Sequence, residues 1–127
     1  MIPEVESQIE VARGDLSDAK KLAALGFVKI AARCAYYAAF HAVEAYIFAR
    51  TTKATKTHSG VRAQLALLLK DTPGVRDTLP AFLARAYRLK DISDYGKFGD
   101  VVTEAEMRDA IEGAERFVDH IVGLLEI

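Results

Sequence analysis

The segment from Phe27 to Arg50 constrains the fold more than any other part of the sequence. Apolar residues occupy nearly every side of it when it is drawn as a helix. A helix that is apolar all round is a buried helix. Six alanines would let neighbouring helices approach closely while keeping helix propensity high. They are Ala31, Ala35, Ala38, Ala39, Ala42 and Ala45. We therefore expect a central helix that other helices surround.

Two segments before and after this one also carry helical signals. From Val5 to about Gly26, apolar residues recur every three or four positions and line one face of an amphipathic helix. After a polar stretch at 51–57, Thr57 or Ser59 is suited to cap a short helix. That short helix should stop at the Thr-Pro-Gly turn at 72–74.

The C-terminal third of the chain predicts two more helices. One begins near Thr78, tolerates Pro80 in its first turn and ends at Gly96. The other starts at Thr103, which forms a capping box with Glu106. No segment alternates apolar and polar residues over the length of a strand. The sequence thus predicts an all-α, up-and-down four-helix bundle with an additional short helix. A length of 127 residues fits one domain over 1–127.

Several classes of protein are excluded or disfavoured by the composition. The chain has one cysteine, Cys34, so no intrachain disulfide forms, and a reducing cytoplasm is the expected setting. Its acidic start does not match a signal peptide, and no apolar run approaches the roughly 20 residues of a membrane span. His41, His58 and His120 lack a second His or Cys at ligand spacing, so we expect no metal and no cofactor.

Charge is strongly segregated although the formal net charge is only −1. Residues 45–70 contain five cations and no acid, whereas residues 100–127 contain eight acids and two arginines. One interpretation is a phosphate-binding segment that includes Lys53, Lys56 and Arg62. The other is a solvated connector whose charges pair with the acidic last helix, in the same chain or in a dimer mate.

The densest polar cluster runs from Arg88 to Tyr95. Helical spacing places Arg88, Asp91 and Tyr95 on one face, and Lys90 and Asp94 on another. An arginine beside a tyrosine hydroxyl could hold a phosphate, because the guanidinium donates two parallel hydrogen bonds. The alternative is an Arg88–Asp91 pair that fastens the helix end while Tyr95 closes the bundle.

The central helix and its neighbours offer a few more candidate residues. His41 lies on an apolar face and is predicted to be a hydrogen-bonded core histidine. His58, among basic residues, is the better candidate for phosphate contact or proton transfer, with a role at the helix start as the alternative. Arg33 and Tyr37 add polar groups that an interhelical hydrogen bond explains as well as a function does.

Three motifs together resemble a known family. They are AARCAYYAAFHA at 31–42, THSGVR at 57–62 and DYG at 94–96. Their order and spacing are similar to those of the small stand-alone HEPN proteins, whose name stands for higher eukaryotes and prokaryotes nucleotide-binding. The resemblance implies a helical bundle that dimerises and is frequently the partner of a minimal nucleotidyltransferase in prokaryotic toxin–antitoxin systems.

Active members of that family are metal-independent RNases with an Arg and a His on one helix of each protomer. Arg stabilises the charge on the phosphate, and His transfers protons. With Arg88 in the Arg position, Ser93 occupies the His position and Tyr95 the motif Tyr. Serine is not an acid or base near neutral pH. A second alignment places Lys90 in the Arg position, five residues before Tyr95.

Three hypotheses follow. The first is a dimeric HEPN partner of a nucleotidyltransferase, associated with RNA or nucleotides, with little nuclease activity and with nucleotide attached to Tyr95, as the resemblance implies. The second is an active RNase at the dimer interface, for which the catalytic candidates are Arg88, Tyr95 and His58. The third is a non-catalytic dimeric interaction module. Candidate RNA- or nucleotide-binding residues are Lys90, Lys53, Lys56, Arg62 and Arg33.

Overall fold

The computed structural model describes residues 2–97 and 99–126. Five helices form in this part of the chain, and no strand does. The predicted all-α bundle is therefore confirmed. The helices are α1 (Pro3–Ala24), α2 (Val28–Thr51), α3 (His58–Leu69), α4 (Thr78–Tyr95) and α5 (Glu104–Leu125).

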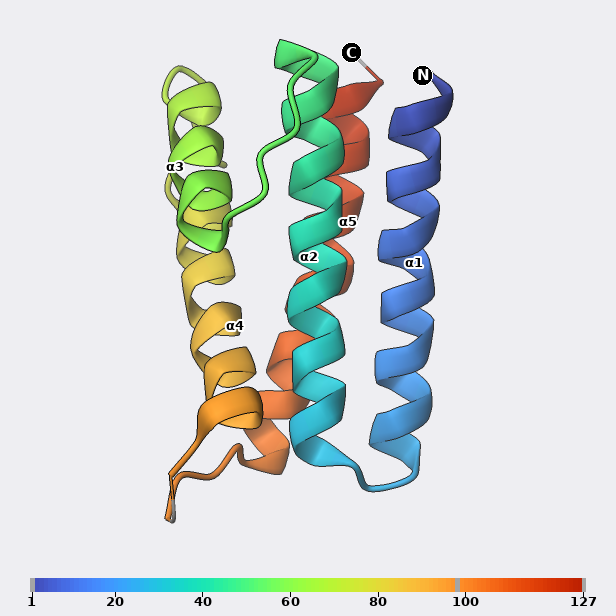
Figure 1. Cartoon of the computed structure of the whole chain (residues 1–127), viewed down its shortest axis with the longest axis vertical. Coiled ribbons are helices and arrows are strands. Elements are labelled where there is room, and N and C mark those ends of the chain that lie inside the picture. The colour runs from blue at the N-terminus through green and yellow to red at the C-terminus, as the bar shows by residue number, and fades with distance from the viewer. Residues whose placement is uncertain (1, 98, 127) are drawn as a thin grey trace.

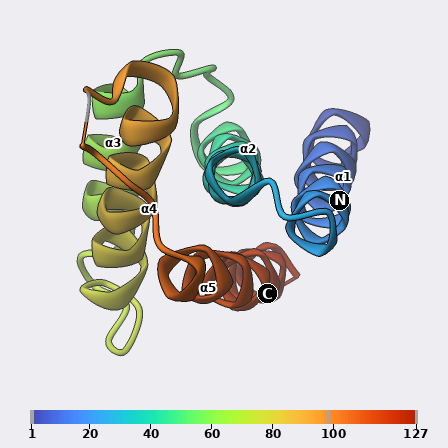
Figure 2. The same cartoon turned by 90° about the horizontal axis from the view of Figure 1, so that it is seen from below.

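Helix α2 is the centre of the bundle, as its apolar surface predicts. It lies between α1 on one side and the α3–α4 pair on the other, with α5 across from them (Figure 2). Half of its 24 residues are buried. All six alanines of the sequence pattern have no exposed surface. These small side chains let the surrounding helices pack against the α2 backbone.

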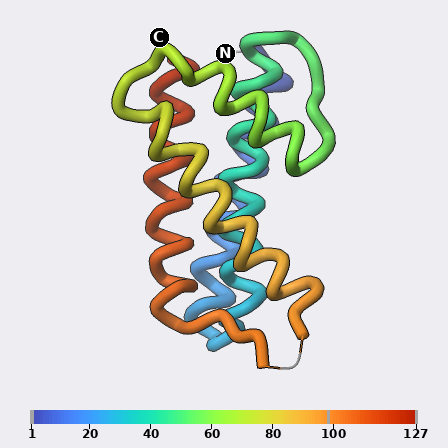
Figure 3. The backbone as a smooth tube through the Cα atoms, turned by 90° about the vertical axis from the view of Figure 1, so that its left-hand side faces the viewer, coloured from blue at the N-terminus to red at the C-terminus, as the bar shows by residue number. Residues whose placement is uncertain are grey.

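The chain runs up and down through four long helices (Figure 1). The turn between α1 and α2 and the connection between α4 and α5 lie at the same end of the bundle. The short helix α3 lies beside α4 on the outer side, and α4 crosses obliquely relative to α5 (Figure 3). As a result, the C-terminal end of α4 lies beside the N-terminal end of α2.

The helix boundaries follow the capping signals in the sequence. Thr57 is the N-cap of α3, and its hydroxyl accepts a hydrogen bond from the backbone N–H of Gly60. Thr103 and Glu106 form the predicted capping box at the start of α5. Helix α4 ends at Gly96, where a Cβ atom would collide with the carbonyl oxygen of Ile92. Both capping predictions are confirmed, and the capping alternative Ser59 is wrong.

Candidate functional site

A three-residue ion-pair cluster, which we call the Asp94 clamp, joins the end of α4 to the start of α2. The Arg33 Nε donates to Asp94 Oδ1 at 2.8 Å, and Lys90 Nζ lies 3.0 Å from Asp94 Oδ2. The Lys90 side chain is only 6% exposed, and that of Asp94 is 20% exposed. Burial raises the pKa of Asp94, but the hydrogen bonds from Lys90 and Arg33 outweigh it and hold that pKa below its usual value. The clamp therefore keeps Asp94 ionised.

Two predicted binding residues are thus already engaged within the chain. The sequence predicts Arg33 and Lys90 as contacts for RNA or nucleotide, and in the structure both form ion pairs with Asp94. The interhelical hydrogen bond expected of Arg33 is present. The spacing of Lys90 and Asp94, at i and i+4 on one helix face, is the feature of the sequence that predicts their contact.

Tyr95 follows the clamp as the last residue of α4 and is exposed. Its residue surface is 77% accessible, whereas Tyr36 and Tyr46 are buried and Tyr37 and Tyr87 are half-buried. The Lys90 ammonium group lies 5.4 Å from the centroid of the Tyr95 ring, within cation–π range. The prediction that Tyr95 closes the bundle is wrong, because most of this residue is exposed to solvent.

Arg88, Asp91 and Tyr95 line one shallow hollow on the outer face of α4, as their spacing predicts. Tyr87, Lys97 and Asp100 are among the other residues that line this α4 hollow. Arg88 does not pair with Asp91, however. Its guanidinium lies 2.6 Å from Glu106 Oε2 of α5, so the predicted Arg88–Asp91 pair is wrong. Arg88 therefore joins α4 to α5 and does not form the predicted ion pair within α4.

His58 lies in a second cluster, among aromatic rings, one of which, Tyr87, also lines the α4 hollow. Its Nδ1 is 2.6 Å from the hydroxyl of the fully buried Tyr36. The Phe40 and Tyr87 rings lie 4.9 and 5.1 Å from its ring centroid. Burial lowers the pKa of His58, and the nearby charges of Lys90 and Arg62 lower it further. These surroundings favour the neutral form of His58, which does not line the α4 hollow.

Arg62 contributes to this aromatic cluster rather than to an open basic surface. Its guanidinium lies 4.6 Å from the centroid of the Tyr87 ring. Its Nη1 is buried and finds no hydrogen-bond partner in the described part of the chain. Lys90 also approaches Tyr87, at 5.6 Å. Two cations thus share one aromatic ring.

The rest of the basic segment is solvated. Lys53 and Lys56 are exposed in the connection before α3. Within residues 2–97 and 99–126, no ion pair joins the basic segment to α5; Arg50 reaches only the Leu124 carbonyl oxygen, at 3.1 Å. Two acids of α5 pair instead with α1, through Lys20–Glu115 at 3.0 Å and Arg13–Asp119 at 3.5 Å. The prediction of pairing within the chain is therefore wrong.

His41 is the hydrogen-bonded histidine that its position predicts. Its Nδ1 lies 2.7 Å from Asp15 Oδ2 of α1, and its Nε2 lies 3.9 Å from Glu44 Oε1. The side chain is 25% exposed, so it lies at the edge of the core rather than inside it. The hydrogen bond with Asp15 raises the pKa of His41.

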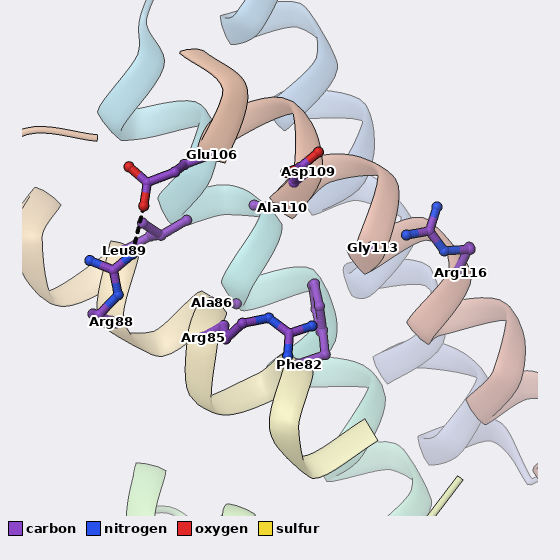
Figure 4. Close-up of a pocket in the computed structure, with 10 residues that line it drawn as sticks. All are labelled: Phe82, Arg85, Ala86, Arg88, Leu89, Glu106, Asp109, Ala110, Gly113 and Arg116. Atoms are coloured by element: carbon purple, nitrogen blue, oxygen red, sulfur yellow. Dashed lines mark hydrogen bonds and ion pairs between the residues drawn. The ribbon is translucent and has the colours of Figure 1, made fainter. Parts of the chain in front are cut away.

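A groove between α4 and α5 was not predicted from the sequence. It has a volume of about 340 Å³ (Figure 4). We call it the α4–α5 groove; among the residues that line it are Phe82, Arg85, Arg88, Glu106, Gly113 and Arg116. Arg88 lines both this groove and the α4 hollow. The sequence does not predict Arg85 and Arg116 as site residues, because they lie on different helices that are brought together only by the tertiary structure.

Two kinds of feature are absent from the described residues. No group of three or more His, Cys, Asp or Glu side chains is placed to hold a metal ion there. Nor is any helix in that part of the chain long and apolar enough to cross a bilayer.

Comparison with known proteins agrees with the three motifs and with the helical architecture. The HEPN domain profile matches residues 5–124. A putative toxin of Methanocaldococcus jannaschii is 31% identical over 118 residues, which cover 93% of this chain and 86% of that relative. A UPF0332 protein of Archaeoglobus fulgidus is 32% identical over 115 residues, which cover 91% of this chain and 90% of the relative. On this evidence the chain belongs to the HEPN domain family.

Proposed function

We propose that this HEPN protein is the acceptor partner of a minimal nucleotidyltransferase in a toxin–antitoxin-like pair, and that Tyr95 receives the nucleotide. The observation that carries the proposal is the exposure of Tyr95, at 77%, on the end of a helix that the Asp94 clamp holds in place. An enzyme that modifies a side chain needs it accessible and held in a defined position. The toxin-like name of one relative supports the biological setting.

The reaction is a nucleotidyl transfer. The Tyr95 hydroxyl oxygen attacks the α-phosphorus of a nucleoside triphosphate, a new P–O bond forms, and pyrophosphate leaves. The hydroxyl proton passes to a base of the transferase.

Mass spectrometry tests this proposal. The purified protein is incubated with the nucleotidyltransferase encoded beside it, Mg²⁺ and each nucleoside triphosphate in turn. We expect one nucleotidyl group on Tyr95 and none in Tyr95→Phe. Tyr37→Phe, which removes the hydroxyl of a half-buried tyrosine, serves as the matched control and should be modified normally. Modification of another residue, or of none with all four triphosphates, would refute the proposal.

A second candidate function is a metal-independent RNase. It is favoured by one observation, the presence of Arg88, Asp91 and Tyr95 around one hollow. Two others weigh against it. Arg88 is neutralised by Glu106 at 2.6 Å, and His58 uses its Nδ1 on Tyr36 outside the hollow. Labelled RNA incubated with the protein in excess EDTA, beside Arg88→Ala, separates the two functions. Cleavage that depends on Arg88 would establish the nuclease.

We also propose that two copies associate, as the family resemblance implies. If the basic segment of one copy docks on the acidic α5 of the other, the dimer should weaken with salt, because exposed charges are screened beyond about 8 Å at physiological ionic strength. Sedimentation at low and high salt measures this. A dimer that is indifferent to salt would exclude charge docking as its basis.

A further inference from the structure

The α4–α5 groove has the size and the floor of a small-molecule site. Its volume of about 340 Å³ lies within the range of ligand pockets, about 300–1,000 Å³. Apolar atoms of Phe82, Ala86 and Leu89 line it from α4. On the α5 side, Gly113 lies so close to the Phe82 ring that a Cβ atom there would collide with it. The absence of a side chain at Gly113 therefore lets the Phe82 ring form part of the floor of the groove.

Positive charge dominates the rim of this groove. Arg85, Arg88 and Arg116 line it together with two acids, Glu106 and Asp109 (Figure 4). Glu106 is engaged with Arg88. Arg85 and Arg116 form no ion pair with any described residue, and the Arg85 guanidinium lies 5.9 Å from the Phe82 ring centroid. Apart from the Arg88–Glu106 pair, the groove is therefore lined by two arginines, Arg85 and Arg116, and one acid, Asp109, with no ion-pair partner among the described residues.

We propose that the α4–α5 groove binds a phosphate-bearing ligand of nucleotide size through Arg85 and Arg116, and that Glu106 competes with this phosphate for Arg88. Guanidinium groups are suited to phosphate because they donate two parallel, charge-assisted hydrogen bonds. The apolar floor offers a surface for a base. The site is separate from the Tyr95 hydroxyl and does not depend on its modification.

Glu106 is the residue that makes the competition testable. Its Oε1 accepts hydrogen bonds from the Thr103 backbone N–H at 3.1 Å and from the Thr103 hydroxyl at 3.2 Å, whereas its Oε2 faces Arg88. Glutamine also serves as the third residue of a capping box. Glu106→Gln should therefore keep the start of α5 intact while removing the charge that neutralises Arg88.

The experiment is an NMR titration of the full chain with three probes. Adenosine 5′-monophosphate carries the phosphate, adenosine lacks it, and a short single-stranded RNA presents the phosphate in a chain. We expect shifts of the Arg85, Gly113 and Arg116 signals with the monophosphate or with the RNA, and at least about tenfold weaker binding of adenosine. Tighter binding of the RNA than of the monophosphate would identify a nucleic-acid chain as the ligand, and equal binding a free nucleotide.

Substitutions then test the residues. Arg116→Ala and Arg85→Ala should each weaken binding of the monophosphate about fivefold to tenfold, and Glu106→Gln should tighten it about threefold or more. Arg108→Ala is the matched control, because it removes an exposed cation of α5 that lies outside the groove and pairs with Glu104. Equal weakening by Arg108→Ala, binding of adenosine as tight as that of the monophosphate, or no binding of any probe at millimolar concentration would overturn the site. Unchanged affinity in Glu106→Gln would overturn the competition.

Discussion

Two histidines lie on either side of the central helix in opposite electrostatic surroundings: His41 on α2 and His58 at the start of α3. Towards α1, His41 meets the carboxylates of Asp15 and Glu44, and its pKa is raised. At the start of α3, His58 is half-buried, and its partial burial together with the charges of Lys90 and Arg62 lowers its pKa. Histidine is thus biased towards the charged form at one site and towards the neutral form at the other. The difference shows that the surroundings decide the ionisation of a histidine: a carboxylate of α1 for His41, and burial with nearby cations for His58.

On the side of α2 that faces α4, Asp94 is the carboxylate that pairs with both Arg33 and Lys90. Removing it should therefore have the largest effect on the free energy of unfolding. Asp94→Ala would leave the buried Lys90 without its nearest ion-pair partner, and would leave Arg33 with no ion pair to any described residue. Breaking one side of a buried pair costs about 3 kcal/mol. Urea unfolding should measure a loss of this order. Asp91→Ala is the control: its carboxylate is 47% exposed and 4.0 Å from Lys90, and we expect a loss below about 1 kcal/mol. Equal losses in the two variants would contradict the clamp.

The pH dependence of stability should separate the two histidines, starting with His58. Its folded pKa lies below the unfolded value of about 6.5, so the unfolded chain takes up a proton first as the pH falls. Stability should therefore decrease below about pH 6.5, by no more than about 1.4 kcal/mol per pH unit. In His58→Gln this decrease should flatten. Urea unfolding between pH 5 and 6.5 tests it; an unchanged slope would show that His58 is not held neutral.

His41 should give the opposite result in a different pH range. Its folded pKa is above the unfolded value, so its stabilising contribution is complete below about pH 6.5 and is lost as the pH rises through the folded pKa. His41→Gln should be less stable than the parent near pH 6, and the gap should narrow by pH 8. A gap that stays constant between pH 6 and 8 would mean that the hydrogen bond with Asp15 does not depend on charge.

The smallest expected effect concerns the exposed Arg88–Glu106 pair. Glu106→Gln removes the ion pair but keeps the capping box, so it should cost no more than about 0.5 kcal/mol, because exposed pairs contribute little. Thr103→Ala, which removes the cap, should cost about 1 kcal/mol. Thermal unfolding of both variants compares them. If Glu106→Gln costs more than Thr103→Ala, the Arg88 contact is structural and does not act as a displaceable partner.

Local patterns in the sequence predicted those features that depend on one helix at a time. The apolar surface of 27–50 predicted a central α2, and Thr103 with Glu106 predicted the start of α5. Spacing also placed Arg88, Asp91 and Tyr95 around one hollow. It failed for the partner of Arg88. The sequence favours Asp91, three residues away, whereas in the bundle Glu106 of α5 comes within 2.6 Å.

The sequence by itself determined the number of helices, their caps, the burial of α2 and the membership of the HEPN family. These features follow from periodicity, capping residues and the order of motifs, which can all be read along the chain. Only the tertiary structure decided which charges meet. The Asp94 clamp, the shielding of His58 and the groove with Arg85 and Arg116 each combine residues from different helices. Their distances are set by how the helices pack, and neither composition nor spacing along the chain contains that information.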